Sequence, residues 1–355
     1  MFTHASLGWS DFFEKQLPLD LRASLLPARV AEEQKGLYRV FCEAGDLLAD
    51  LAGKLRSAAG ARPELPAVGD WVLVRPRPAE ARATIHQLLK RRSKFSRQAA
   101  GRATSEQVIA ANVDTAFIVT AVNRDFSPRR IERYVALAWE SGARPVVLLN
   151  KADLLDDPLP LLWEAEAAAP GVAVHLLSAA TGSGLDALSL YLAPGQTTVL
   201  LGSSGVGKST LINRLAGREL LRVSAISDAS DRGRHTTTAR QMIPLDAGGL
   251  LIDTPGLREL QLWDSSSGLG RTFEDIASFA AACRFRDCSH QSEPGCAVVS
   301  AVESGELAPE RLESRRKLER ELAFQHRKQD LAARLAEQRR WRAIHKAQRD
   351  FYKRP

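Results

Sequence analysis

A glycine-rich loop is the first segment whose residue types and spacing define a chemistry. The run GSSGVGKS fits the phosphate-binding pattern G-x-x-x-x-G-K-[ST], and it lies between a strand-like run, TTVLL, and a helix-like run. In such a loop the backbone N–H groups surround the phosphates, and the lysine reaches the β- and γ-phosphates. The strand–helix frame disfavours the alternative, an ordinary glycine-rich turn. The expected nucleotide-binding residues are Gly202, Ser203, Ser204, Gly205, Val206, Gly207, Lys208, Ser209 and Thr210.

Two loops upstream carry residues that would select the base. The motif NKAD, from Asn150 to Asp153, follows the run RPVVLL, and the Asp153 carboxylate can accept the N1–H and 2-amino protons of guanine. Adenine lacks this pair of donors, so the unpaired carboxylate would penalise ATP. Asn150 and Lys151 would brace the loop and cover the base. A backbone N–H at Ser178-Ala179 would contact the guanine O6. These loops favour GTP and GDP over a transporter-type ATPase, which would also need an LSGGQ-like signature.

Two phosphate-side motifs indicate a magnesium ion. The run DTPG begins at Asp253 after the strand-like run GLLI, and its aspartate would hold Mg²⁺ through water. The N–H of Gly256 would sense the γ-phosphate. In the run GRHTTT, Thr237 or Thr238 would complete the Mg²⁺ shell beside Ser209 in the GTP state. A plain β-turn is the alternative for DTPG, and the phosphate loop disfavours it.

The residue after DTPG bears on the rate of hydrolysis. Leu257 stands where Ras-like GTPases place a glutamine that orients the attacking water. An apolar side chain cannot orient water, so intrinsic hydrolysis should be slow. His235, in the threonine loop, is the candidate catalytic replacement, and the alternative is that it is a surface loop residue.

Three cysteines and one histidine crowd into a short stretch. Cys283, Cys288, His290 and Cys296 supply three thiolates and an imidazole, the donor set that structural zinc prefers in a tetrahedral site. Their spacing departs from the commonest C-x₂-C fingers, and the alternative is four residues buried in a helical core. Cys42 stands alone and should pack within a strand. The cluster predicts one Zn²⁺ per chain.

The order of the motifs is unusual. Along the chain they run NKAD, SA, GSSGVGKS, GRHTTT and DTPG, whereas a conventional GTPase has the phosphate motifs first and the guanine motifs last. Strand-like and helix-like runs alternate from Val113 to Gly256, which predicts a parallel sheet with helices on both faces. Because the termini of compact domains lie close together, they can be joined and the chain reopened elsewhere. The sequence therefore predicts a circularly permuted P-loop GTPase domain over residues 111–262.

The flanking segments differ from this domain in their hydrophobic pattern and in their charge. Short alternating strands predict a small β-barrel over residues 28–110, behind a lead-in of residues 1–27. The net charge is +7, but residues 311–355 alone hold 15 Lys/Arg and 6 Asp/Glu, a net of +9. Such a basic tail favours a polyanionic partner over a merely solvated helix face. A basic run with one aromatic residue ends the barrel, and its RNA-binding candidates are Lys90, Arg91, Arg92, Lys94, Phe95 and Arg97.

The combination of motifs resembles the RsgA (YjeQ) family of circularly permuted GTPases. The resemblance covers nearly the whole chain, through GLYRV, VGDWV, SKFSR, NKAD, GSSGVGKST, GRHTTT, DTPG and the cysteine cluster. It implies a multi-domain α/β protein with an N-terminal OB-fold barrel, the permuted GTPase domain, and a zinc-binding helical domain over residues 263–355. It also supports the zinc ligands and a catalytic His235.

The resemblance further implies a GTPase that binds the small ribosomal subunit and its rRNA, assists its late maturation, and is stimulated by it. The alternative is an RNA-binding module that uses GTP as a structural ligand with little turnover, which Leu257 keeps open. We expect a monomer. No run approaches the ~18 apolar residues of a membrane span, and the N-terminal residues show no export signal, so a cytoplasmic protein is expected.

Overall fold

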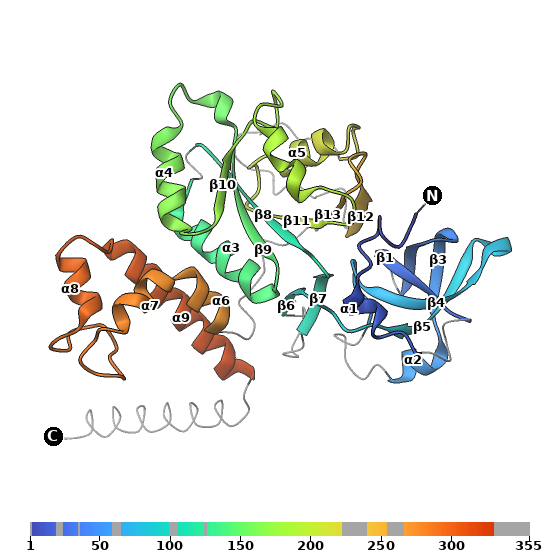
Figure 1. Cartoon of the computed structure of the whole chain (residues 1–355), viewed down its shortest axis with the longest axis horizontal. Coiled ribbons are helices and arrows are strands. Elements are labelled where there is room, and N and C mark those ends of the chain that lie inside the picture. The colour runs from blue at the N-terminus through green and yellow to red at the C-terminus, as the bar shows by residue number, and fades with distance from the viewer. Residues whose placement is uncertain are drawn as a thin grey trace, which may run out of the picture.

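A computed structural model places three bodies side by side: a β-barrel, a central α/β domain and a group of C-terminal helices (Figure 1). The residues that it describes are 2–18, 24–34, 36–58, 65–98, 106–123, 126–221, 240–253 and 266–329. No helix within these residues has the length and apolar character needed to cross a membrane.

Five strands form the N-terminal barrel. Each strand buries alternate residues around a core that includes Val30, Val40 and Ile85, and the strand order β1-β2-β3-β5-β4 closes through pairing of β1 with β4. This closed five-stranded arrangement confirms the predicted OB-like barrel. Its elements are β1 (Leu26–Gln34), β2 (Leu37–Cys42), β3 (Gly45–Leu51), α2 (Gly53–Ala58), β4 (Trp71–Arg77), η2 (Pro78–Glu80) and β5 (Arg82–Leu88).

The expected lead-in is a packed part of the barrel. The short helix α1 (Asp11–Glu14) and the turn before it bury Leu7 and Phe13 completely. Trp9 meets Trp71 edge-on, with ring centroids 4.7 Å apart. Two further strands, β6 (Lys94–Gln98) and β7 (Glu106–Ala111), form a separate hairpin between the barrel and the central domain.

The central domain is the predicted sheet with helices on both faces. Its strand order is β10-β9-β8-β11-β13-β12, with β12 alone antiparallel to its neighbour β13. Alternate strand residues face two cores: Ile118 and Leu149 face α3 and α4, whereas Phe117 and Leu148 face α5. The elements are β8 (Thr115–Ala121), α3 (Pro128–Ser141), β9 (Arg144–Asn150), η3 (Ala152–Leu154), α4 (Leu159–Ala168), β10 (Ala173–Leu176), η4 (Leu185–Tyr191), β11 (Thr197–Leu201), α5 (Lys208–Leu215), β12 (Gln241–Pro244) and β13 (Leu250–Asp253).

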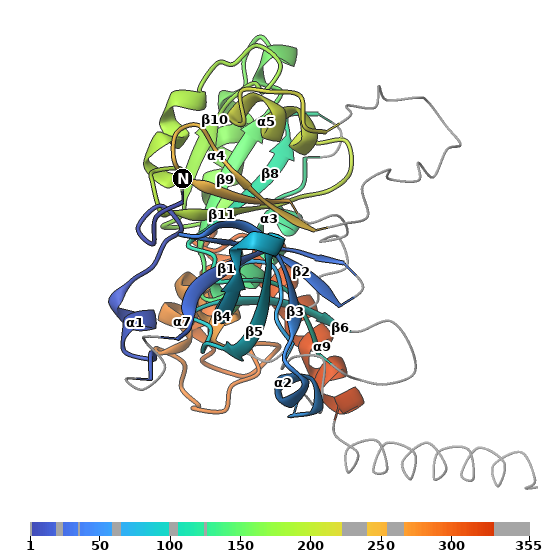
Figure 2. The ribbon, with the colours of Figure 1, turned by 90° about the vertical axis from the view of Figure 1, so that its right-hand side faces the viewer.

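A joint connects the barrel to this sheet. Strand β1 pairs with β12, with Glu32 opposite Gln241, so the two bodies share one continuous sheet (Figure 2). Arg29 of β1 is 1% exposed, and its guanidinium spans the joint. It donates hydrogen bonds of 2.5–3.1 Å to the carbonyl oxygens of the lead-in, barrel and central domain and to one hydroxyl: Leu7 O, Gly69 O, Asn112 O and Thr197 Oγ1.

Within residues 266–329 the structure describes four helices, and two of them, α6 and α9, pack against α3. Arg311 of α9 is 8% exposed and reaches into the central domain, where it meets Glu132 of α3 at 2.9 Å and also pairs with Asp275. Arg133 of α3 forms a two-point pair with Glu321 of α9 at 2.7 and 2.8 Å. The helices are α6 (Ser266–Thr272), α7 (Glu274–Ala280), α8 (Ala297–Glu303) and α9 (Pro309–Gln329).

Candidate nucleotide-binding site and metal centre

The predicted nucleotide loops lie at one edge of the central sheet. Strands β9, β8, β11 and β13 are neighbours and run parallel, so their carboxyl ends meet at this edge. The NKAD loop follows β9, the phosphate loop follows β11, and Asp253 ends β13. In open parallel sheets, ligands bind in the crevice at this edge. The permuted chain order therefore leaves the spatial order of the loops suited to a nucleotide.

Glycine is required at two points of the phosphate loop. Gly207 has a φ of 96°, and a Cβ there would lie 2.3 Å from Asn150 Nδ2. Gly202 has a φ of 149°, and its Cβ would meet the carbonyl oxygen of Val119 at 2.3 Å. These close approaches let the loop lie against β8 and the NKAD segment. Lys208, at the start of α5, bends back over the loop and donates to the carbonyl oxygens of Gly202 at 2.9 Å and Ser203 at 2.5 Å.

Asn150 links three loops. Its side chain is buried, with Nδ2 donating to the Val206 carbonyl at 2.7 Å and Oδ1 accepting the Ala179 N–H at 2.9 Å. Lys151, in a left-handed conformation with φ of 66°, extends over the phosphate loop and donates to the Gly205 carbonyl at 2.7 Å. Both side chains of the NKAD segment therefore donate hydrogen bonds to carbonyl oxygens of the phosphate loop.

The residues expected to contact the guanine base are Asp153, Ser178 and Ala179. Asp153 lies in η3, and its side chain is exposed. Ser178 is buried and closes its own turn by accepting the Thr181 N–H at 3.1 Å. A backbone N–H at Ser178-Ala179 is expected to meet the guanine O6, and here the Ala179 N–H donates to Asn150 Oδ1. Binding a base through that N–H would therefore require it to be shared or released.

The expected magnesium ligands are described in part. Ser209 is the second residue of α5 and the last residue of the phosphate-loop motif. Asp253 lies on the neighbouring strand, because β11 and β13 pair with Val199 opposite Ile252. These two residues thus come from adjacent elements at the same edge, as a shared Mg²⁺ ion requires. The catalytic candidate and the remaining phosphate-side residues lie outside the described part of the chain: His235, Thr237, Thr238 and Gly256.

The four predicted zinc ligands converge in the C-terminal body. Their ligand atoms all lie within 4.8 Å of one another. Cys283 Sγ lies 3.9 Å from Cys296 Sγ, and His290 Nδ1 lies 3.6 and 3.5 Å from these two sulfurs. Tetrahedral zinc, with Zn–S of about 2.3 Å and Zn–N of about 2.0 Å, places sulfurs about 3.7 Å apart and sulfur and nitrogen about 3.5 Å apart. The donor set and the spacing therefore both fit a structural zinc ion.

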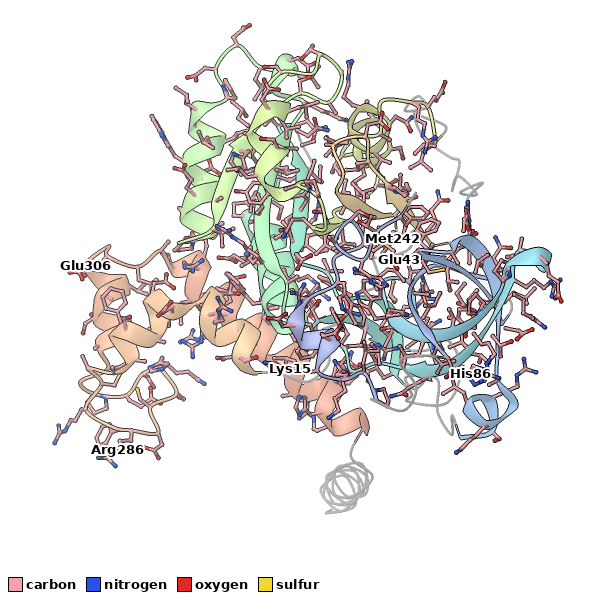
Figure 3. The ribbon with its side chains drawn as sticks, turned by 45° about the vertical axis from the view of Figure 1, so that its right-hand side comes forward. Lys15, Glu43, His86, Met242, Arg286 and Glu306 are labelled. Carbon is pink, nitrogen blue, oxygen red and sulfur yellow. The ribbon has the colours of Figure 1, made fainter. Side chains whose placement is uncertain are left out.

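Hydrogen bonds shape the loop that carries these ligands. Glu293 accepts from the Ser289 hydroxyl and from the backbone N–H groups of Gln291 and Ser289, the last two at 2.8 and 2.9 Å. These hydrogen bonds hold the pKa of Glu293 well below its usual range. Arg316 of α9 donates to the His290 carbonyl, and His290 has a φ of 57°. The far side of the loop is exposed, and Arg286 projects outward from it (Figure 3).

The basic run between barrel and central domain is more structural than expected. Phe95 lies in β6 and is 2% exposed, so its ring packs in the core and presents no face to a base. Arg91 pairs with the buried Asp70 at 2.7 Å. Burial raises the pKa of Asp70, and the guanidinium of Arg91 opposes that shift. Phe95 and Arg91 are both among the predicted RNA-binding candidates. The pleat of β6 explains why the Phe95 side chain turns inward.

The other basic candidates are closer to the surface. Lys94 pairs with Glu106 at 2.7 Å, Arg92 pairs with Asp114, and Arg97 donates to Gln107 at 3.3 Å. The side chains of Lys90, Arg92 and Lys94 are exposed. The usable basic surface of this run is therefore smaller than its composition indicates.

One residue that contacts the phosphate loop belongs to none of the sequence motifs. Arg130, in the first turn of α3, donates a 3.1 Å hydrogen bond from its guanidinium to Ser203 Oγ. Its only signal in the sequence is a pair of arginines after SP, at a position where a helix begins. Such a pair does not say which loop its side chains meet.

Comparisons with known proteins agree with this site. The model of the RsgA GTPase family matches residues 88–263, and a model described as a 50S ribosome-binding GTPase matches residues 197–332. Small ribosomal subunit biogenesis GTPase RsgA of Opitutus terrae is 48% identical over 98% of this chain and 97% of its own. Its namesake in Syntrophotalea carbinolica is 44% identical over 95% and 94%.

Solved structures give the same result. The crystal structure of YjeQ from Thermotoga maritima matches with a TM-score of 0.65 and 30% identity, covering 84% of this chain and 99% of its own. The structure of YloQ, described as a circularly permuted GTPase, matches with a TM-score of 0.61 and 26% identity, covering 84% and 96%. With a relative 48% identical over nearly its full length, this chain belongs to the RsgA family of GTPases.

Proposed function

We propose that this chain is a cytoplasmic GTPase that binds the small ribosomal subunit and assists its maturation. The observation that carries the proposal is the Asn150 side chain, which ties the phosphate loop and the guanine-side loops together at one sheet edge. The relatives named as small ribosomal subunit biogenesis GTPases support the choice of partner.

The described loops suggest a role for each group. Lys208 would leave the carbonyl oxygens of Gly202 and Ser203, which now accept hydrogen bonds from its ammonium, and would neutralise the β- and γ-phosphates. Ser209 and Asp253 would hold Mg²⁺, which supplies charge neutralisation at the phosphates when bound. Asp153 would select guanine over adenine. We also propose that His235 acts in hydrolysis, that Thr237 or Thr238 completes the Mg²⁺ shell, and that Gly256 senses the γ-phosphate.

The C-terminal body would be a zinc-stabilised RNA-binding module. Cys283, Cys288, His290 and Cys296 would hold one zinc ion as a closed structural site, with no position left for chemistry. The exposed side chains of Lys90, Arg92 and Lys94 on the barrel side would contribute a second contact to rRNA. Two contacts on one chain bind far more tightly than either one alone.

Steady-state phosphate release tests the proposal. GTP turnover is measured with purified small subunits, with large subunits and with neither, using Asp153→Asn as a matched variant. We expect small subunits alone to raise the rate, and we expect the variant to lose discrimination against other purine nucleotides because an amide offers both a donor and an acceptor. An RNA-binding module that uses GTP only structurally would show no turnover in any of the three conditions.

A further inference from the structure

The first turn of α3 holds two arginines at the positively polarised end of the helix dipole. The N-terminal end of a helix carries partial positive charge, so cations there are unfavourable unless a partner offsets them. This turn holds Arg129 and Arg130 and no acidic residue. Arg129 pairs with Glu313 of α9. Arg130 is half-buried and lies on the phosphate loop, where it donates to Ser203 Oγ at 3.1 Å.

Two cations therefore meet at one residue of the loop. Lys208 Nζ binds the Ser203 carbonyl at 2.5 Å, while Arg130 binds its hydroxyl. The second half of the loop is held separately, through Asn150 and the Val206 carbonyl at 2.7 Å. Ser204, between the two anchors, is exposed. When a nucleotide draws Lys208 onto the phosphates, the hydrogen bond from Arg130 still holds the Ser203 hydroxyl.

We propose that Arg130 is a positioning residue for GTP hydrolysis and that it acts through Ser203. This inference rests on the proposed GTPase function. The guanidinium is permanently charged and planar, so it can fix the serine while adding positive charge beside the phosphate site. A displacement of about 1 Å can lower a reaction rate by about 100-fold, whereas binding through many backbone N–H groups tolerates it better. Loosening Ser203 should thus affect kcat more than nucleotide affinity.

A double-mutant cycle tests this role. Arg130→Ala, Ser203→Ala and the double variant are compared for kcat and KM with saturating small subunits, and for GDP affinity by equilibrium titration. We expect each single variant to lose about tenfold in kcat with GDP affinity within about threefold, and the double variant to lose no more, because residues that act as a unit are not additive. Arg129→Ala is the matched control from the same turn, and it should keep kcat within about twofold because its partner Glu313 is on α9.

Three outcomes would overturn the inference. They are a normal kcat in Arg130→Ala, losses that multiply in the double variant, and a GDP affinity that falls as far as kcat. The same cycle run on intrinsic turnover without subunits separates this inference from the proposed function. If small subunits fail to stimulate the unmodified chain, the proposed function fails, and the intrinsic rates still decide whether Arg130 and Ser203 act together.

Discussion

The barrel and the C-terminal helices are attached to the same central domain by different chemistry. At the barrel joint, one strand pairs with the central sheet, and Arg29 donates to backbone carbonyls and a hydroxyl. At the C-terminal joint, charged side chains of α3 and α9 pair with one another, including Glu132 with Arg311 and Arg133 with Glu321. Neutral acceptors dominate the first joint, and carboxylates dominate the second.

This difference predicts different responses to pH and salt. Burial lowers the pKa of Arg29 to about 10, so its guanidinium stays protonated near neutral pH. Burial raises the pKa of Glu132, and hydrogen bonding to Ser314 and the charge of Arg311 oppose that rise. The barrel joint should therefore be stable across the neutral range. The C-terminal joint contains a carboxylate whose charge depends on its partner.

The two joints also differ in their position relative to the phosphate loop. The first turn of α3, the helix that holds the C-terminal joint, contains Arg130, which contacts the phosphate loop. Within the next three residues it presents Glu132 and Arg133 to α9. The C-terminal joint is thus one helical turn from the phosphate loop. We infer that it is the joint whose stability follows the bound nucleotide, while Arg29 keeps the barrel fixed.

Removing the metal should cause the largest loss of folding free energy, and this loss should be confined to the C-terminal body. Cys288→Ser should lose zinc and much of the folding free energy of the C-terminal body, on the order of 10 kcal/mol for structural zinc in small modules. Metal analysis and hydrogen exchange measure this. Cys42→Ser, at the one cysteine outside the cluster, should keep one zinc per chain. A metal-free protein with unchanged exchange in α8 would contradict the zinc assignment.

Breaking the C-terminal joint at its buried pair should be next in size. Arg311→Met leaves Glu132, 3% exposed, without its cation, at a cost of about 3–5 kcal/mol. The pKa of Glu132 then rises further above its unfolded value, so the folded state binds a proton more readily. The loss should be full at neutral pH and shrink as pH falls through the raised pKa.

Urea unfolding between pH 5 and pH 8 checks this variant. Adding Glu132→Gln should recover part of the loss and remove its pH dependence. An equally large loss at every pH, unchanged by Glu132→Gln, would mean that Arg311 acts only through its contacts with Asp275 and the backbone.

Breaking the barrel joint should cost less and should not depend on pH near neutrality. Arg29→Met leaves several buried acceptors without a donor, and we expect a loss of about 3 kcal/mol. Arg39→Met is the matched control, since Arg39 pairs with Asp46 on the barrel surface and such pairs contribute about 1 kcal/mol or less. Urea unfolding of both variants measures the difference. Equal losses would show that Arg29 does not hold the joint.

The exposed pair of the C-terminal joint should give the smallest effect. Arg129→Ala removes the pair with Glu313, which is worth about 0–1 kcal/mol and is screened by salt. Unfolding at low and high ionic strength checks this expectation. A loss above about 2 kcal/mol that persists in high salt would place this pair among the buried contacts.

The comparison also explains what the sequence could predict. The phosphate loop, NKAD and the zinc ligands are local patterns, since each function needs fixed residue types at short spacing, and the structure brings each group together. Arg29 has no such pattern, because its acceptors are mostly backbone carbonyls from segments far apart in the chain. The burial of Phe95 is not evident from the sequence, because the charged residues around it obscure the two-residue alternation of β6. Arg130 could be placed only once α3 was seen to begin beside the phosphate loop.

Hydrogen exchange on the intact protein tests the central claim most directly. The exchange of amides in α9 and in β1 is compared between protein saturated with a non-hydrolysable GTP analogue and protein saturated with GDP. We expect α9 to exchange faster with GDP, because the C-terminal joint loosens when the phosphate loop loses the γ-phosphate, and we expect β1 to be unchanged. Equal changes in both elements, or none in α9, would contradict it.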